Sequence, residues 1–234
     1  MERRLEAAGV VKPGQTEVVH PGIDTTLMAP TGRREPFFLI PGRIMWSKNV
    51  ELGIRAFMTL KEESDRTEVQ ASRLVVAGMV DEKSRPYLQS LRALVAGRDD
   101  VDFVLSPADE ELLDLYDRCF AVLFTPPNED WGIVPLEAMA FGKPVVAVGR
   151  GGPAESVVDS ETGYLRDAAA GPFAEAMERL LSEPEVYERI SQAARERAQR
   201  YDWARFVDRI DEYLYELAGD ARPNEFSVRD AYRV

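Results

Sequence analysis

The sequence contains one cysteine and one histidine among 234 residues, and no apolar run approaches the ~18 residues needed to span a bilayer. Cys119 therefore has no partner for an internal disulfide, and its apolar neighbours in LYDRCFAVLF predict a small buried side chain. His20 lacks a second histidine for a metal site, so we interpret it as a loop residue between domains. The charged amino terminus does not resemble a secretory signal, which leads us to expect a cytoplasmic protein.

Basic residues are also in the minority, with 29 Lys and Arg against 41 Asp and Glu, for a net charge of −12. Nucleic acids and anionic lipids bind to basic surfaces, so we predict no nucleic-acid partner. A small anionic ligand stays compatible with this charge, because distant charges are screened by salt. A single cation ~4 Å from a phosphate still gains ~4 kcal/mol at an effective dielectric constant of ~20.

Short β-branched runs alternate with segments of helical periodicity along most of the chain. This alternation predicts an α/β fold, a Rossmann-like parallel six-stranded sheet with helices on both faces, followed by C-terminal helices. The predicted strands are 16–20, 37–41, 73–78, 101–106, 121–125 and 143–148. The predicted helices are 50–62, 84–95, 109–117, 132–141 and 152–158, with a wholly helical region from 172 to 217.

Domain boundaries follow from the same pattern. Residues 1–17 are interpreted as a linker or the remnant of a preceding domain. Residues 18–217 are expected to form one domain, and residues 218–234 a flexible tail.

Two glutamates frame the segment NEDWGIVPLEAMAFGKP, which follows the predicted strand 121–125. Glu129 falls on the loop at the carboxyl end of that strand and Glu137 on the next helix, at the sheet edge where open α/β sheets bind ligands. The first amides of the helix lack intrahelical acceptors, so they are free to bind an anion. These amides belong to Gly132, Ile133 and Val134.

A second motif, PGRIMWSKN, follows the predicted strand 37–41 and lies at the same edge of the sheet. Arg43 and Lys48 place two cations at this edge, where they can neutralise a bound anion. The lysine is informative because the chain has only five lysines against twenty-four arginines. Gly42 either lets the backbone approach the ligand or simply closes the turn. The alternative for Arg43 and Lys48 is that they are solvated loop residues.

In this order the motifs resemble the family 4 glycosyltransferases, retaining enzymes of GT-B fold that transfer a sugar from a nucleotide diphosphate donor. EDWGIVPLEAMAFGKPVVA resembles the family's E-x7-E signature, and PGRIMWSKN resembles its G-R-x4-K motif. HPGID, GGPAESVVDSETGYL and the tryptophan that opens the last helix, Trp203, support the resemblance. The similarity extends from about Val18 to Leu217, and Trp131 replaces a common phenylalanine while keeping an aromatic ring.

The resemblance implies a role for each residue of the two motifs. Glu137 would accept hydrogen bonds from the ribose diol, and Glu129 would reach hydroxyls of the transferred sugar, so both acids bind rather than shuttle protons. Arg43 and Lys48 would replace a metal ion at the diphosphate, and no cofactor is implied. Arg43, Lys48 and Glu129 would thus contact the reacting groups, with Trp131 in the donor site. Without the resemblance, Glu129 is a helix-entry acid and Glu137 a partly exposed surface residue.

The resemblance also implies a donor, an acceptor and a missing half. The donor would be GDP-mannose or a UDP-sugar, and the reaction a hexosyl, possibly mannosyl, transfer in cell-surface glycan biosynthesis. Complete enzymes carry two Rossmann-like domains, and the acceptor site, for an unknown glycan or lipid-linked molecule, belongs to the amino-terminal one. We therefore expect a donor-binding half, inactive without an N-terminal domain or partner chain, through which it would reach the membrane surface.

Two alternatives come from other classes of protein. The chain could be a noncatalytic nucleotide-sugar-binding subunit that acts with a separate acceptor-binding chain. It could also be a structural Rossmann-like module, but the intact Arg43, Lys48, Glu129 and Glu137 argue against this.

DDVDF superficially resembles a metal-binding D-x-D motif, but Asp100 and Asp102 lead into a predicted strand and are interpreted as a solvated strand start. GGPAES is interpreted as a helix entry beside the donor site, with Gly151 and Gly152 close to the sugar.

Overall fold

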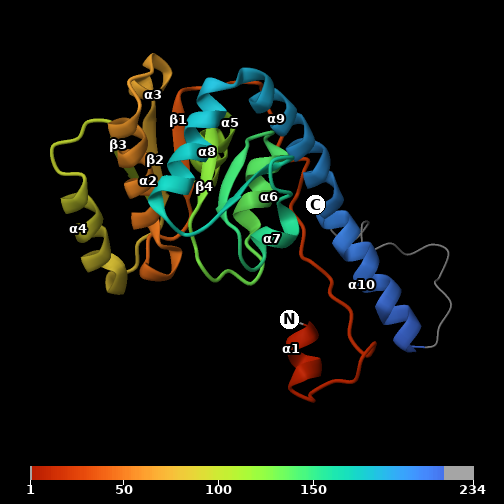
Figure 1. Ribbon diagram of the computed structural model, residues 1–234. Helices are drawn as coiled ribbons and strands as arrows, with labels where there is room; N and C mark the ends of the chain where they lie inside the picture. Colours follow the sequence, from red (N-terminus) through yellow and green to blue (C-terminus); the bar gives the residue numbers. More distant parts are fainter. Residues whose placement is uncertain (1, 219–234) are drawn as a thin grey trace. The chain divides into compact units, whose positions relative to one another are not determined.

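The computed structural model describes residues 2–218, which fall into two compact units (Figure 1). The larger unit runs from Thr25 to Arg200, and the smaller one combines the chain before Thr25 with the chain after Arg200. The expected tail, 218–234, lies outside the described residues except for Ala218. The domain boundaries inferred from the sequence stay a prediction.

The larger unit contains a six-stranded, all-parallel sheet, which confirms the predicted fold class. The strand order is β3-β2-β1-β4-β5-β6, so the direction of winding reverses between β1 and β4. Ligands of doubly wound sheets bind at such a switch point, outside the carboxyl ends of the strands. The strands are β1 (Phe37–Pro41), β2 (Arg73–Gly78), β3 (Val101–Leu105), β4 (Ala121–Phe124), β5 (Val145–Val148) and β6 (Gly163–Arg166).

One predicted strand was wrong, and one real strand was missed. Residues 16–20 form no strand and belong to the smaller unit, where their β-branched pattern finds no neighbouring strand to pair with. The sixth strand is instead β6, of sequence GYLR, which pairs with β5 from Val145 opposite Gly163 to Val148 opposite Arg166. A four-residue edge strand that contains glycine and arginine carries little β signal of its own.

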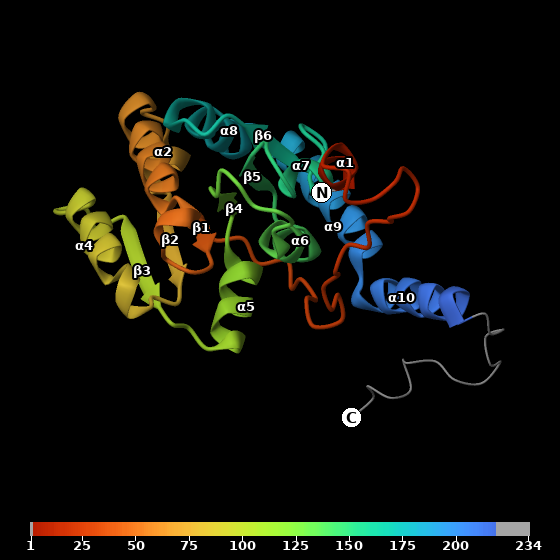
Figure 2. The ribbon, with the colours of Figure 1, turned by 90° about the horizontal axis from the view of Figure 1, so that it is seen from below.

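Helices cover both faces of the sheet, and Figure 2 shows α2 and α8 on one face with α5 and α6 on the other. The predicted helices that follow β1 to β5 agree with the structure to within two residues at each end, whereas α3 and the short η1 and η2 were not predicted. The α-helices of this unit are α2 (Val50–Glu63), α3 (Thr67–Ala71), α4 (Arg85–Leu94), α5 (Asp109–Arg118), α6 (Ile133–Ala140), α7 (Pro153–Ser156), α8 (Ala170–Ser182) and α9 (Pro184–Ala198). The 3-10 helices are η1 (Trp46–Lys48), η2 (Glu82–Ser84) and η3 (Gln199–Tyr201), the last of which ends in the smaller unit.

The two central strands, β1 and β4, and the neighbouring β5 are buried along their whole length, as expected for parallel strands covered on both faces. Cys119, just before β4, is fully buried, which confirms the prediction of a small buried side chain. Burial raises the pKa of Cys119 to about 12, so the thiol stays neutral at physiological pH.

The smaller unit contains α1 (Glu2–Ala7), an extended segment, and α10 (Trp203–Ala218). The segment HPGID is held at the start of α10, where the amide of Trp203 donates a 2.7 Å hydrogen bond to the carbonyl oxygen of Ile23. Gly22 is required there because a Cβ atom would lie 2.4 Å from the Tyr201 carbonyl oxygen. His20 lies in this segment with its ring edge-on to Tyr201. None of the helices between residues 2 and 218 is long and apolar enough to cross a bilayer.

Candidate ligand-binding site

The carboxyl ends of β1 and β4 enclose a cavity of about 170 Å³ at the switch point. Figure 2 views the sheet from the edge at which these strands end. Four of the ligand-binding residues that the sequence predicts line this cavity. They are Gly42, Arg43, Lys48 and Val134. The parallel pairing of β1 with β4 therefore joins the two motifs, which are far apart along the chain, in one site.

The loop after β1 is shaped by a glycine and by an asparagine in left-handed conformations. Gly42 has φ of +119°, and its carbonyl oxygen comes so close to Gly78 at the end of β2 that a Cβ there would lie at 1.7 Å. Asn49, with φ of +48°, ends η1 and turns the chain into α2. The two left-handed residues begin and end the loop that places Lys48 at the cavity.

Thr125, just after β4, fixes the backbone of that loop and was missed by sequence reasoning. Its hydroxyl is buried and donates a 2.7 Å hydrogen bond to the carbonyl oxygen of Lys48. A polar residue at the carboxyl end of an otherwise apolar strand was the signal that could have identified it.

Lys48 and Glu129 form an ion pair of 2.5 Å between Nζ and Oε2. Their side chains are 26 % and 24 % exposed, so the pair is partly shielded from water. The acid of the first motif and the lysine of the second are thus already in contact across the site. A ligand that uses either group must compete with the other.

Arg43 is exposed and, among the described residues, has no ion-pair or hydrogen-bond partner. Its charge is close enough to Asp81 to contribute to that group's lowered pKa, after the larger effect of hydrogen bonds from Ser84. A cation at the rim of the cavity is therefore available to a bound anion.

The loop that carries Glu129 is held against the glycines of GGPAES. The amide of Gly152 donates a 2.8 Å hydrogen bond to the carbonyl oxygen of Glu129. A Cβ on Gly152 would lie 1.8 Å from the Trp131 carbonyl oxygen, and one on Gly151 would lie 2.2 Å from that of Glu129. These glycines therefore position the acidic loop, whereas their closeness to a sugar stays a prediction.

The first turn of α6 points unpaired amides toward the ligand edge of the sheet. Gly132, the N-cap, has φ of +77° and offers no side chain to cap the helix. Within the described chain, the amides of Gly132, Ile133 and Val134 have no hydrogen-bond acceptor. Such amides, with the positive end of the helix dipole, favour anions.

Glu137 lies one turn further along α6 and does not line the cavity. Its Oε2 accepts a 2.6 Å hydrogen bond from the hydroxyl of Tyr116, a fully buried residue stacked on Phe141. Burial raises the pKa of Glu137, and the hydrogen bond from Tyr116 opposes this only in part. Burial and the nearby carboxylate also raise the pKa of Tyr116, so the tyrosine stays a donor.

The D-x-D acids are engaged in ion pairs. Asp100 contacts Arg98 at 2.7 Å and Lys61 at 3.7 Å, and Asp102 contacts Arg73 at 2.7 Å. Asp100 is only 19 % exposed, so a partly buried pair replaces the expected solvated side chain. Among residues 2–218, no three His, Cys, Asp or Glu side chains cluster in a way that could hold a metal ion.

The sheet order and the cavity at its switch point define a Rossmann-like domain of the kind that forms one half of a GT-B glycosyltransferase. The chain belongs to the glycosyl transferases group 1 family, whose sequence profile matches residues 26–197.

Relatives of known function agree with this assignment. The chain is 32 % identical over 197 residues to alpha-1,3/1,6-mannosyltransferase ALG2 of Mus musculus, covering 81 % of this chain and 47 % of the relative. It is 30 % identical over 222 residues to D-inositol 3-phosphate glycosyltransferase of Nocardiopsis dassonvillei, covering 89 % and 52 %. The chain thus spans about half the length of the curated relatives it matches.

Solved structures show the same fold. Sucrose-phosphate synthase from Thermosynechococcus elongatus superposes with a TM-score of 0.79 at 25 % identity, over 93 % of this chain and 56 % of that one. The C-terminal domain of a group 1 glycosyl transferase from Francisella tularensis gives 0.69 at 24 % identity, over 76 % of this chain and 97 % of that one.

Substitution of Gly152 tests the support of the acidic loop. We expect Gly152→Ala to weaken nucleotide binding and lower the melting temperature, because its Cβ would meet the Trp131 carbonyl oxygen at 1.8 Å. Gly171→Ala is the matched control, since Gly171 lies in the first turn of α8 and a Cβ there meets nothing within 4 Å. Equal effects of the two changes in calorimetry and thermal denaturation would contradict this role.

Glu137 should destabilise the fold in its ionised form. Because its pKa is raised in the folded state, it stabilises the protein below the ordinary pKa of glutamate, and this contribution is lost as pH rises through the raised value. Glu137→Gln still accepts from Tyr116 and cannot ionise, so it should be more stable than the parent at neutral pH, with the difference shrinking in acid. Glu137→Leu should cost about 1–3 kcal/mol, because the Tyr116 hydroxyl loses its acceptor. Urea denaturation across pH measures both, and a pH-independent difference for Glu137→Gln would refute the argument.

Proposed function

We propose that this chain is the donor-binding half of a retaining glycosyltransferase, which transfers a hexosyl group from a nucleotide diphosphate sugar without a metal ion. The observation that carries the proposal is the convergence of Arg43 and Lys48 on one cavity at the switch point, with Lys48 paired to Glu129. Two cations beside unpaired helix amides suit a diphosphate, and a carboxylate beside them suits sugar hydroxyls.

The diphosphate would contact Arg43, Lys48 and the first amides of α6. The amides are those of Gly132, Ile133 and Val134. These groups stabilise the charge that develops as the leaving group departs. Gly42, which carries no side chain at the cavity wall, leaves the backbone open to the phosphates.

The two acids would bind the remaining parts of the donor. Glu129 would accept hydrogen bonds from the transferred sugar, beside Trp131. Glu137 would use its Oε1 atom for the ribose diol, because Oε2 is occupied by Tyr116. Tyr116 would thus orient the carboxylate that holds the ribose.

Binding of the donor would exchange partners within the Lys48–Glu129 pair. Lys48 would turn to the phosphates, and Glu129 would be released to the sugar hydroxyls. A free nucleotide diphosphate supplies only the first of these replacements, so Glu129 would lose its cation without gaining a sugar. The pair would therefore favour the complete donor over the free nucleotide.

GDP-mannose is the donor we propose, since the relatives named as mannosyltransferases are among the most similar in sequence. A UDP-sugar is the alternative donor. The acceptor is a glycan or a lipid-linked molecule bound by a further domain or chain, which would also supply contact with the membrane surface. The present half would lie on the cytoplasmic side.

Calorimetry on two glutamate variants tests these roles. Glu129→Gln should leave the affinity for a nucleotide diphosphate unchanged or improved, because Lys48 loses its competing partner. The same change should weaken the nucleotide sugar by about 1.5–3 kcal/mol, the usual value of a hydrogen bond to a charged group. Glu137→Gln should weaken both ligands, because both contain the ribose.

The control for that experiment is Glu51→Gln, the same change of charge on α2, where the acid pairs with Arg55 on the helix surface. Both ligands should bind this variant as they bind the parent. Losses of equal size for both ligands in both active-site variants would contradict the assignment of roles.

Transfer should require an acceptor half. Holding the acceptor hydroxyl against the anomeric carbon contributes about 7–11 kcal/mol to lowering the barrier. We therefore expect the purified chain to bind nucleotide diphosphate and to transfer no sugar, and an added acceptor-binding half to restore transfer. Robust transfer by the chain alone would contradict this prediction, and binding without transfer after such addition would indicate a noncatalytic subunit.

A further inference from the structure

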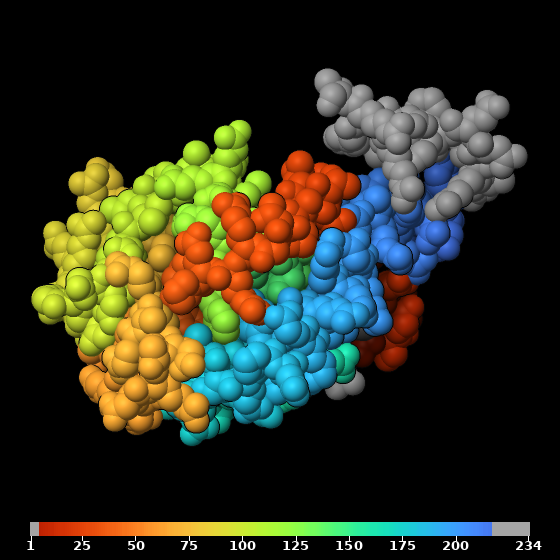
Figure 3. All heavy atoms as spheres, turned by 90° about the horizontal axis from the view of Figure 1, so that it is seen from above, coloured from red at the N-terminus to blue at the C-terminus, as the bar shows by residue number. Residues whose placement is uncertain are grey.

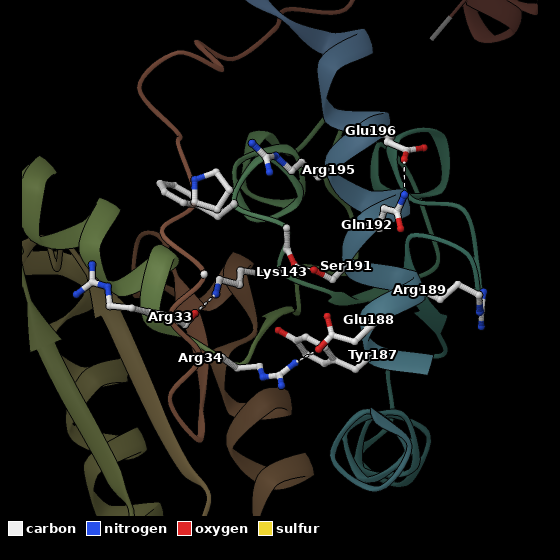
Figure 4. A pocket seen from close by; sticks show the side chains of 14 residues that line it. Arg33, Arg34, Lys143, Tyr187, Glu188, Arg189, Ser191, Gln192, Arg195 and Glu196 are labelled. Atoms are coloured by element: carbon white, nitrogen blue, oxygen red, sulfur yellow. Dashed lines mark hydrogen bonds and ion pairs between the residues drawn. The ribbon is translucent and has the colours of Figure 1, made fainter. Parts of the chain in front are cut away.

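A second and larger cavity, of about 890 Å³, lies at the opposite edge of the sheet (Figure 4). Its walls are the segment before β1, the turn from α6 to β5, and α9. Figure 3 shows the orange segment before β1 running across this face next to the blue α9. The amino ends of β1 and β5 lie here, so this cavity is separate from the one at the switch point.

Basic side chains line this cavity although the chain as a whole is acidic. Five cations and two carboxylates contribute to its walls. Arg33 points away to Asp114 and Asp117, and Arg189 donates to the Ser160 carbonyl oxygen. The cations that remain beside the hollow are Arg34, Lys143 and Arg195.

Lys143 is the most unusual of these cations because it is only 4 % exposed. Its ammonium donates one hydrogen bond, of 2.7 Å, to the neutral carbonyl oxygen of Arg33. An ammonium has three N–H donors, so two are left without an acceptor among the described residues. Burial lowers the pKa of Lys143, Arg33 and Arg34 lower it further, and Cys119 and Asp117 oppose them.

The two arginines line the other walls of the cavity, Arg34 on the segment before β1 and Arg195 on α9. Arg34 stacks over the ring of Tyr187 at 4.6 Å and pairs with Glu188 at 2.6 Å. Both members of that pair are well exposed, so it is weak and can exchange for another anion. Arg195 has no partner among residues 2–218, and in Figure 4 it extends from α9 toward the segment before β1.

We infer that this cavity is a second anion site, which binds a phosphate-bearing ligand between Arg34, Lys143 and Arg195. Guanidinium groups bind phosphate oxygens in pairs, and a buried ammonium adds a point charge at the base of the site. The bound anion would provide Lys143 with the charged acceptor that it lacks. Of the two acids, Glu196 is occupied by Gln192, and Glu188 would be released from Arg34. The phosphate belongs either to a small soluble molecule or to a lipid headgroup.

Titration with inorganic pyrophosphate tests the site, in a chain whose other cavity is disabled by Arg43→Gln and Lys48→Gln. Pyrophosphate should still bind to this double variant. Adding Arg34→Gln and Arg195→Gln should weaken that binding tenfold or more, whereas adding Arg55→Gln on α2 should change it less than twofold. The arginines are changed rather than Lys143, because they are exposed and their loss should leave the fold intact.

A second arm separates the two sources of phosphate. Phosphatidylcholine vesicles that contain phosphatidic acid should sediment the same double variant only if the ligand is a lipid headgroup, and the two further arginine changes should abolish this. Binding in either arm that depends on Arg34 and Arg195 supports the site. No binding in both arms, or binding that ignores these arginines, overturns it. The calorimetry on the donor site keeps Arg43 and Lys48 intact, whereas both experiments on the second anion site use the double variant. Failure of one proposal therefore leaves the other untouched.

Discussion

The parallel pairing of β1 with β4 is the contact on which the site depends. It brings together the loops after both strands, so that Lys48 and Glu129, 81 positions apart in sequence, share one hydrogen bond. Thr125 then fixes the backbone of one loop, and Gly152 fixes that of the other. Side chains placed by buried backbone contacts of this kind lose little further freedom when a ligand binds, which favours affinity.

The same arrangement has a cost in stability. Glu137 is a carboxylate in a mostly buried position whose only side-chain partner among the described residues is a neutral phenol. Lys143, at the opposite edge, is a buried ammonium with a neutral carbonyl as its acceptor. In its charged form each group costs stability because it is buried without an oppositely charged partner, and the proposed ligands would give each a better environment. Binding and folding therefore make opposing demands on these positions.

Net charge is a poor guide to the ligands of this chain. Its excess of twelve negative charges excludes a broad basic surface, yet cations gather at each edge of the sheet. At short range a few fixed cations outweigh a distant excess of acid, because water and salt screen the distant charges. Anion sites on an acidic protein therefore have to be sought residue by residue.

By itself the sequence determined the fold class, five of the six strands, and the edge of the sheet where the two motifs meet. These features depend on local patterns, namely buried β-branched runs and the residues that follow them. Only the tertiary structure decided that residues 16–20 are not a strand while GYLR is one, because a strand exists through its neighbours. It alone also paired Tyr116 with Glu137 and Gly152 with the Glu129 loop, since contacts between distant residues depend on packing that no local pattern records.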